Sequence, residues 1–451
     1  MKKRECSYGA NIYDRQERKE GWKQKRLKKA KVALIGCDHI THFLLGAFCG
    51  LGIGHEEEGG HLILYGHGKI SKEEKLKYPF YLEAKEGENR VKGLEEIGKK
   101  INPNLAIKGI NWVFSEKDLN LFLGKEDLII EATNEMETKD MLINFSNKMK
   151  KPLISASCDK DGLKIFFNHY KQNSTCDFSD FKNRTQSIVT AELAAGIIAD
   201  EVRKFFNPLK TDLPYNEKEF EFKLFEDSPE SPKLEAPHFL IVGFGTGGCW
   251  EAPVYASLGA SKMDIIDPDY IEPTNLNRQW LFYCSVGKWK VDVGKERLKL
   301  VNPNLKIKAY RKRFEDLKNS YFRKNMPDII VEGVDNYETR YEILKESLKH
   351  KIPYISSGVS FDAGRVVTTY PGKTSSLEEV LEISRFIKKR RASCIWERNP
   401  SVVTTNIVVS ALSISETLKV LDPRYGEPFD GIIRYESNSK EKIFFRPVKK
   451  I

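Results

Sequence analysis

The chain of 451 residues carries the same eight-residue phrase twice. Residues 101–108 read INPNLAIK, and 200 residues later 301–308 read VNPNLKIK. The match extends in both directions, with KVALIGCDHITHF (31–43) like HFLIVGFGTGGCW (238–250) and DLIIEATNEMETK (127–139) like DIIVEGVDNYETR (328–340). A repeat of this length predicts two copies of one whole domain, because each copy is long enough to bury its own core.

The pattern inside each copy predicts the fold. Short β-branched runs alternate with helical stretches of about 10–20 residues, an order typical of a mostly parallel, doubly wound α/β sheet. We therefore predict two tandem Rossmann-like domains that pair as a pseudo-dimer. The alternating segment EFEFKLF is expected to complete the first copy, before a charged, proline-containing connection. The predicted boundaries are 1–225, a linker at 226–237, and 238–451.

Most of the net charge of +10 lies in the first 31 residues, which hold 12 Lys and Arg against 4 acidic residues. A solvated basic helix and a surface for an acidic protein partner are the two interpretations of this arm. No basic stripe interleaved with aromatic residues occurs elsewhere, so we expect no nucleic-acid partner. No apolar run reaches the ~18 residues of a membrane span, and no apolar signal core follows the basic start.

Eight cysteines are scattered along the chain, and no two of them form a C-x-x-C pair. This spacing argues against a four-cysteine structural site, so we predict no structural zinc. Scattered single thiols are typical of a reducing compartment, and we expect a cytoplasmic protein.

A glycine-rich turn in the second copy predicts a site for a nucleotide phosphate. Gly243, Gly245 and Gly248 follow the apolar run HFLIV and precede a helical stretch. Glycines there let the backbone approach a phosphate, whose charge is held by N–H groups at the helix N-terminus. Asp267 ends the next strand, 19 residues beyond Gly248, where a carboxylate can reach ribose hydroxyls. A nicotinamide-dependent oxidoreductase fits these residues equally well.

The residues that follow favour a triphosphate. Cationic and amide side chains come soon after the ribose carboxylate: Asn275, Arg278, Gln279 and Lys290. Asp335 then opens a loop after a third strand, DIIVEGV. A triphosphate needs cations and a magnesium carboxylate, whereas a hydride-transfer cofactor needs neither. Any one of these residues alone could form a surface salt bridge, but their order after successive strands predicts ATP and Mg²⁺.

These segments together resemble the ubiquitin-activating-enzyme superfamily, which includes the bacterial adenylyltransferases of molybdopterin and thiamine synthesis. The resemblance is carried by GxGxxG, DPDYIEPTNLNRQ, VGKWK and DNYETR, and it covers nearly the whole chain, once per copy. It implies that Asp267 holds the ribose, that Asp269 belongs to the same nucleotide site, and that Asp335 carries magnesium. The phosphate contacts that it implies are Asn275, Arg278, Gln279 and Lys290.

The first copy has lost this set of residues. Its turn reads GCDHIT, so Asp38 replaces the second glycine, and its repulsion of a phosphate costs on the order of a few kcal/mol. Tyr65 matches Asp267 in our comparison of the two copies, Asn134 matches Asp335, and no segment matches NLNRQ. We therefore predict that the first copy binds no ATP, with binding of a different nucleotide as the alternative.

The N-terminal segment IYDRQERKEGWKQKRLKKAKVALIG resembles the part of the family in which an arginine of one adenylation domain reaches the ATP held by its partner. The resemblance implies this role for Arg15. A guanidinium supplied across domains stabilises charge on a transferred phosphoryl group. The alternative is that Arg15 simply belongs to the basic face.

Cys394, in RRASCIWERNPSVVTTN, precedes the last predicted helix. Its spacing to Pro400 resembles the family branches for autophagy and ubiquitin-fold modifiers, which implies a cysteine that takes the activated carboxyl as a thioester. Lys389, Arg390 and Arg391 would favour its thiolate. An inert thiol is an equal alternative. The segment 366–394 is too short for the large cysteine domain of full ubiquitin-activating enzymes.

The predicted reaction is ATP-dependent adenylation of a C-terminal carboxylate, with Arg15, Arg278, Lys290, Asp335 and Cys394 as the catalytic residues. The expected substrate is a ubiquitin-like or sulfur-carrier protein, and a ribosomally made peptide comes next. A conjugating or acceptor protein is a further expected partner, and the chain is expected as a monomeric pseudo-dimer or a higher oligomer. The alternatives from other classes are an NAD-dependent oxidoreductase and a non-catalytic ATP-binding scaffold.

Overall fold

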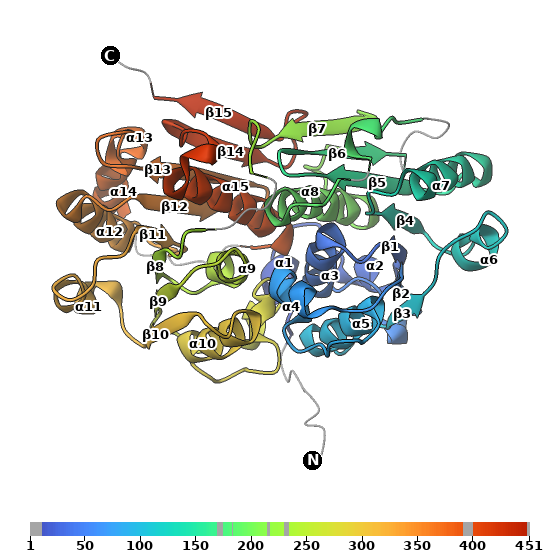
Figure 1. Cartoon of the computed structure of the whole chain (residues 1–451), viewed down its shortest axis with the longest axis horizontal. Coiled ribbons are helices and arrows are strands. Elements are labelled where there is room, and N and C mark those ends of the chain that lie inside the picture. Colours follow the sequence, from blue (N-terminus) through green and yellow to red (C-terminus); the bar gives the residue numbers. More distant parts are fainter. Residues whose placement is uncertain are drawn as a thin grey trace.

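The computed structural model describes residues 11–168, 175–182, 184–213, 217–229, 234–390 and 400–448. These residues form two sheets with flanking helices, one sheet for each copy of the repeat (Figure 1). The strand orders are β3-β2-β1-β4-β5-β6-β7 and β10-β9-β8-β11-β12-β13-β14-β15. Two tandem Rossmann-like units, predicted from the repeat, are confirmed.

The strands of the two copies correspond one to one in sheet order, with β15 added at the end of the second sheet. In the first copy they are β1 (Lys31–Ile35), β2 (His61–Gly66), β3 (Ile107–Asn111), β4 (Leu128–Glu131), β5 (Leu153–Cys158), β6 (Gly162–Phe167) and β7 (Glu219–Lys223). In the second they are β8 (His238–Val242), β9 (Lys262–Ile266), β10 (Lys306–Tyr310), β11 (Ile329–Glu332), β12 (Tyr354–Val359), β13 (Ala363–Thr369), β14 (Gly431–Glu436) and β15 (Ile443–Pro447). The pairs from β3 to β5 and from β10 to β12 are parallel, and the later pairs are antiparallel.

Within the described residues, five helices of each copy occupy matching places between the strands, and the others have no counterpart. The first copy has α1 (Asp14–Glu17), α2 (Gln24–Lys28), α3 (His39–Leu51), α4 (Lys72–Lys77), α5 (Arg90–Ile101), α6 (Leu119–Leu123), α7 (Met136–Met149) and α8 (Ile188–Phe206). The second has α9 (Thr246–Ser257), α10 (Lys290–Val301), α11 (Phe314–Tyr321), α12 (Tyr337–His350), α13 (Leu377–Leu381), α14 (Ile383–Arg390) and α15 (Val403–Leu421). Short 3₁₀ turns include η2 (Pro79–Tyr81), η4 (Pro273–Asn275) and η5 (Trp280–Phe282).

The repeated Asn-Pro-Asn phrase ends a helix and turns the chain into the edge strand of each sheet. Asn102 follows α5, and its Nδ2 donates to the carbonyl of Cys49 at 2.9 Å. Asn302 follows α10, and its Nδ2 donates to the carbonyl of Ala256 at 3.0 Å. Each asparagine also accepts the N–H two residues on, at 3.3 and 3.0 Å. The phrase is repeated because the same side chain anchors the same turn in both copies.

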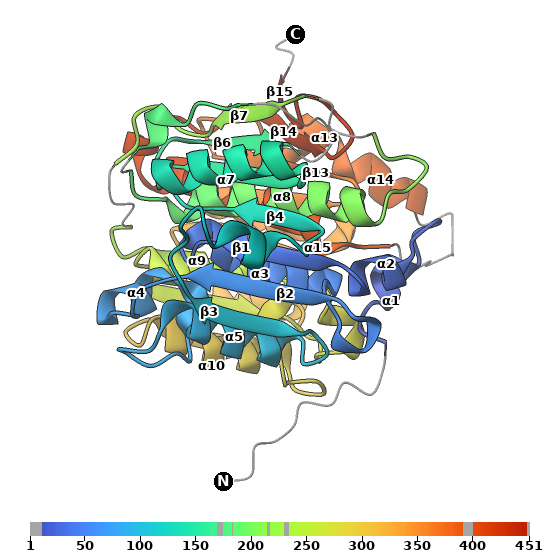
Figure 2. The same ribbon diagram turned by 90° about the vertical axis from the view of Figure 1, so that its right-hand side faces the viewer.

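Two long helices make the centre of the molecule. The 19-residue helices α8 and α15 pack on each other between the two sheets (Figures 1 and 2). Both are buried on nearly all sides, the pattern of a core helix rather than of a surface helix. A β-carbon on Gly196 of α8 would lie 2.7 Å from the side chain of Val408 of α15, so this glycine permits the close approach.

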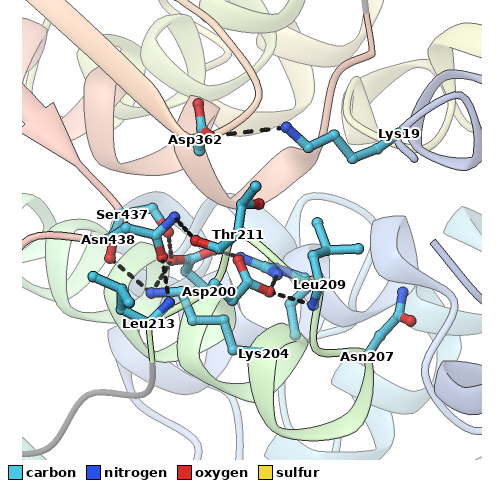
Figure 3. Close-up of polar contacts among 12 residues, drawn as sticks. Lys19, Asp200, Lys204, Asn207, Leu209, Thr211, Leu213, Asp362, Ser437 and Asn438 are labelled. Carbon is cyan, nitrogen blue, oxygen red and sulfur yellow. Dashed lines mark hydrogen bonds and ion pairs between the residues drawn. The ribbon is translucent and has the colours of Figure 1, made fainter. Parts of the chain in front are cut away.

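A buried cluster of charged and hydroxyl groups joins the two copies (Figure 3). Lys204 of α8 donates to the carbonyl of Ser437 at 2.7 Å, and Ser437 Oγ donates to Asp200 at 2.5 Å. Lys442 donates to Glu201 at 2.7 Å. Because both members of these contacts are buried and hydrogen-bonded, loss of either one would leave the other unsatisfied.

None of the helices in the described ranges combines the length and hydrophobicity that crossing a bilayer requires.

Candidate nucleotide site

The glycine turn of the second copy joins β8 to α9. Gly243 has a φ of 83°, a conformation that other residues rarely adopt. Gly245 is the N-cap of α9, and a β-carbon on it would meet no described atom closer than 3.8 Å. The helix N-terminus therefore has room beside its backbone N–H groups, the arrangement that binds a phosphate.

The three predicted glycines do not have the same role. Gly248 is buried, and a β-carbon on it would lie 2.7 Å from the ring of Phe244. Gly247, which is absent from the predicted set, is half-exposed like Gly245. Gly248 is thus a packing position, and the accessible backbone of the turn is that of Gly245 and Gly247.

Asp267 and Lys290 form one charged group beside the turn. Asp267 accepts the N–H of Phe244 at 2.7 Å and that of Asp269 at 2.8 Å. The Lys290 ammonium lies 2.8 Å from Asp269 Oδ2 and 4.0 Å from Asp267 Oδ1. Burial alone would lower the pKa of Lys290, but the two carboxylates outweigh it and raise that pKa, so the ammonium keeps its charge.

The two predicted amides of the loop 275–279 differ in what they contact. Asn275 Oδ1 accepts the N–H of Glu272 at 2.9 Å, so this side chain holds the local η4 turn. Gln279 is buried, and its Nε2 donates to Thr246 Oγ1 on the glycine turn at 3.4 Å. Its Oε1 has no hydrogen-bond partner within the described residues. Gln279 therefore reaches the helix N-terminus, whereas Asn275 is engaged within its own loop.

Two arginines from different copies lie close together here. Arg278 is 8% exposed, and its Nη1 donates to Thr274 O and Asn277 Oδ1, both at 2.8 Å. Arg15 is half-buried on α1, and its carbonyl accepts the N–H of Ser401 at 3.0 Å. Burial, and then the charge of Arg15, lower the pKa of Arg278 to about 9. A bound anion would relieve this repulsion, which makes the arrangement suitable for a triphosphate.

Asp335 lies on the loop between β11 and α12. This loop meets the glycine turn, since a β-carbon on Gly243 would lie 2.9 Å from Val334 Cγ1 and 3.0 Å from the carbonyl carbon of Gly333. Asp335 itself is exposed. A single carboxylate at this edge fits a Mg²⁺ ion that takes its other ligands from substrate phosphates and water. Within the described ranges, no group of three or more His, Cys, Asp or Glu is placed to hold a metal by itself.

Cys394, together with the neighbouring Arg391, lies outside the described residues. Its acceptor role therefore stays a prediction.

An ion pair that supports the β11–α12 loop was missed in the sequence. Buried Arg340 pairs with Glu332 at 3.2 Å and donates to the carbonyl of Val334 at 2.8 Å. In the first copy Lys139 forms the corresponding buried pair with Glu131. The signal was present, because EATNEMETK and EGVDNYETR carry the acid and the base at equal spacing.

The sheet register corrects one predicted correspondence. The N–H of Gly36 donates to the carbonyl of Tyr65, just as that of Gly243 donates to Ile266, both at 2.8 Å. The counterpart of Asp267 is therefore Gly66, and the prediction of Tyr65 was wrong by one residue. An apolar strand such as HLILY matches a neighbouring strand equally well after a one-residue shift, and only pairing in the sheet defines its register.

The first copy keeps the shape of this edge and changes its chemistry. Asp38 is the N-cap of α3, as Gly245 is of α9. The Asp38 carboxyl accepts from the Tyr78 hydroxyl at 3.4 Å, and the Tyr78 ring stacks on His39 at 4.1 Å. These side chains put a carboxyl group and aromatic rings where the second copy leaves backbone accessible.

Arg90 of the first copy is a counterpart that sequence comparison missed. It begins α5, as Lys290 begins α10. It forms an ion pair with Glu74, and its Nη1 lies 3.9 Å from Cys37 Sγ. Asn134, at the position of Asp335, donates to the carbonyls of Cys158 and Arg184, both at 2.8 Å. One cation is thus retained, but it is paired within its own domain.

Models of protein families give the relationship directly: the ThiF family model matches residues 10–227 and again 215–449. The chain belongs to the ThiF family. The resemblance inferred from the motifs is confirmed, and this ThiF family chain carries the family's domain twice.

Several curated proteins are similar to parts of this ThiF family chain. It is 31% identical to SUMO-activating enzyme subunit 2 of Dictyostelium discoideum over 173 residues, 38% of this chain and 25% of that protein. It is 28% identical to molybdopterin-synthase adenylyltransferase of Haemophilus influenzae over 166 residues, 36% of this chain and 66% of that protein. The crystal structure of E. coli MccB with ATP is 26% identical, with a TM-score of 0.42, and the match covers 48% of this chain and 64% of that one. This chain thus spans less than two thirds of each of these relatives.

Proposed function

We propose that this ThiF family chain is an adenylyltransferase that uses ATP to activate a carboxylate. The observation that carries the proposal is the contact between the two copies at this site. Ser401 donates to the carbonyl of Arg15 at 3.0 Å and accepts from Asn277, which is next to Arg278 on the loop beside the accessible N-terminus of α9. Two guanidinium groups beside the N-terminus of a helix suit a polyanion and do not suit a neutral ligand. The names of the relatives, which include adenylyltransferases, support the same activity.

The two copies have different tasks in this proposal. Residues 1–225 form an inactive adenylation domain, 226–237 form the linker, and 238–451 form the domain that binds ATP. The acid at position 38 and the loss of a carboxylate at Gly66 support this division. The first copy then contributes by supplying Arg15 to the site of the second.

The geometry supports the following chemistry. A substrate carboxylate oxygen attacks the α-phosphorus of ATP, the bond to the pyrophosphate oxygen breaks, and an acyl adenylate forms. Arg278, Lys290 and Arg15 offset the negative charge on the transferred phosphoryl group and on the departing pyrophosphate. Asp335 would hold Mg²⁺, which when bound supplies further positive charge to the phosphates.

The substrate in this proposal is a protein or peptide with an accessible C-terminal carboxylate. Two relatives are named for SUMO and for molybdopterin synthase, which supports a ubiquitin-like or sulfur-carrier protein as the substrate. A ribosomally made peptide, which can also present a C-terminal carboxylate, is the second candidate. The proposed further step transfers the acyl group from the adenylate to the Cys394 thiolate, which forms a thioester and releases AMP.

Pyrophosphate exchange tests the activity. The chain is incubated with ATP, labelled pyrophosphate and candidate acceptors, first any small protein that is encoded beside it and ends in Gly-Gly. We expect label in ATP only with the correct acceptor, and loss of exchange in Asp335→Ala, while Asp38→Ala keeps it. ATP binding without exchange for any candidate would instead indicate a scaffold, and tight NAD binding would indicate an oxidoreductase.

Intact-mass measurement tests the thioester. After a single turnover we expect an adduct of the acceptor's mass that dithiothreitol removes. The same adduct in Cys394→Ala would show that this cysteine is not the acceptor.

A further inference from the structure

A chain of buried amide groups runs from the N-terminal arm of the first copy to Arg278 of the second. Its members are Gln24, Gln16 and Asn277, all of them buried. Asn277 Nδ2 donates to Gln16 Oε1 at 3.3 Å, across a separation of 261 residues in sequence. Asn277 Oδ1 in turn accepts from Arg278 Nη1 at 2.8 Å.

The first copy determines which way the Gln16 amide points. Gln16 Nε2 donates to Gln24 Oε1 at 2.7 Å and to the carbonyl of Leu51 at 3.1 Å. Both amide protons are then used within the first copy, so only the Gln16 oxygen is left to face Asn277. Gln24 is itself held by Trp22, whose Nε1 donates to Gln24 Oε1 at 2.9 Å.

The orientation of Gln16 passes to Asn277. An oxygen on Gln16 requires the Nδ2 end of Asn277 opposite it, and the same Nδ2 donates to the carbonyl of Ser401 at 3.4 Å. The Oδ1 end must then face Arg278, which needs an acceptor because a guanidinium has only donors. A flipped Asn277 would oppose donor to donor at Arg278 and acceptor to acceptor at Gln16.

The backbone of Asn277 also rests on the first copy. A β-carbon on Gly50 of α3 would lie 2.3 Å from the carbonyl oxygen of Asn277. Any side chain at Gly50 would therefore displace the loop that carries Arg278. The first copy thus determines both the position of this loop and which end of the Asn277 amide faces Arg278.

Arg278 needs such a tether because its guanidinium is buried and has only donors. Without the Asn277 acceptor that buried N–H would be unsatisfied, so the guanidinium would gain by moving toward another acceptor. Its other bond at Nη1 is to Thr274 O on its own loop. Asn277 is the contact that ties it to the other copy.

We infer that Gln16 is a positioning residue for the site of the second copy, and that it acts through Asn277 to hold the Arg278 guanidinium where the phosphates of ATP bind. This inference rests on the proposed function. The inactive copy then contributes twice to the site: it supplies Arg15, and it orients the guanidinium of Arg278, which belongs to the second copy.

A double-mutant cycle on ATP affinity tests the inference. The variants are Gln16→Met, which keeps the side-chain length and removes both polar groups, Arg278→Met, and the double variant. We expect Gln16→Met to raise the Kd for ATP on the order of tenfold, since it removes the acceptor that orients a hydrogen bond to a charged group. In the Arg278→Met background the same change should have no further effect. An undiminished effect there would overturn the inference.

Two further variants separate positioning from folding. Ser437→Ala removes a buried hydrogen bond between the copies that does not involve Gln16, Asn277 or Arg278. It should lower Tm while leaving the Kd for ATP unchanged. Gly50→Ala keeps every polar group and should weaken ATP binding by displacing Asn277. If Gln16→Met and Gly50→Ala both bind ATP like the wild type, the inference is wrong. Absence of ATP binding by the wild-type chain would instead reject the proposed function.

Discussion

The two glycine turns, GCDHIT and GFGTGG, show how one backbone can keep its shape and lose a predicted site. Both turns leave the first strand of a sheet, bond to the neighbouring strand through the same N–H, and lead into a helix that faces the other copy. They differ in Asp38 against Gly245 and in Gly66 against Asp267. Backbone geometry and chemistry are therefore separable here, because the turn is held by main-chain bonds and the nucleotide would be held by side chains and exposed N–H groups.

The two copies also differ in what they contribute across their interface. The first copy extends Arg15 and Gln16 toward the second, and the nearest contacts of Gln16 in the second copy are on the loop that carries Arg278. In the first copy, residues 70–81 end with the corresponding η2 turn and contain no Asn, Arg or Gln. Within the described residues, the contribution across the interface to a nucleotide site is thus one-sided.

Placing the acid of the first copy into the second is expected to have the largest effect. Gly245→Asp should weaken ATP binding about 1000-fold, because a carboxylate at the N-terminus of α9 repels the phosphates by a few kcal/mol. Gly245→Ala is the control and should bind ATP nearly normally, since a β-carbon there meets no atom closer than 3.8 Å. Titration calorimetry with ATP measures both. Retained affinity in Gly245→Asp would mean that Asp38 is not what removes the site from the first copy.

Removal of a buried charge at the interface between the copies is expected to have the second-largest effect. Asp200→Asn should lower the free energy of unfolding by about 3 kcal/mol, since it leaves Lys204 and Arg203 short of a buried partner. Urea unfolding measures the change. The control is Asp362→Asn, whose pair with Lys19 is 3.8 Å long and partly exposed (Figure 3), and which should cost less than about 1 kcal/mol. Equal costs for the two variants would contradict a special role for the buried cluster.

The cations at the start of α10 and of α5 are expected to differ in their effect on ATP binding. Lys290→Met should raise the Kd for ATP about 30-fold, because an ammonium next to the phosphates contributes a charge-assisted hydrogen bond. Arg90→Met, at the matching position of the first copy, should leave the Kd unchanged because Arg90 is paired with Glu74. A similar loss in both variants would show that the first copy binds ATP as well.

Substitution of a buried acid of α9 is expected to have the smallest effect, a change in how stability depends on pH. Glu251 stands where α3 has Leu44, and burial, reinforced by Glu332, raises its pKa to about 8. Between pH 4.5 and 8 the folded state therefore holds a proton that the unfolded state releases, so this residue makes the protein less stable as pH rises through that range. Glu251→Gln should reduce the stability lost between pH 5 and 6 by about 1 kcal/mol. Urea unfolding at the two pH values measures this, and an unchanged difference would show that Glu251 is charged in the fold.

Much of the fold could be predicted because its signals are local. The phrase containing Asn102 and Asn302 marks one helix end in each copy, and the apolar strands around it have the period expected of buried parallel strands. The glycine turn and the polar loop that follows it were also found, since their residues are close together in sequence. Two errors were made at the next level: Gly66 rather than Tyr65 matches Asp267, and the Arg340–Glu332 pair was overlooked. Each depends on strand register or on packing between elements, which periodicity does not specify.

By itself the sequence determined that this chain is a duplicated α/β protein and that only its second copy retains the full set of polar residues for a nucleotide. Hydrophobic period, glycine turns and charge at a strand end act over a few residues, so they can be recognised before the chain folds. Only the tertiary structure decided that Gln16 and Gly50 lie against Asn277, more than 200 residues away in sequence. Such contacts follow from how α3, α8, α9 and α15 pack between the sheets, and packing brings together residues whose spacing along the chain carries no signal.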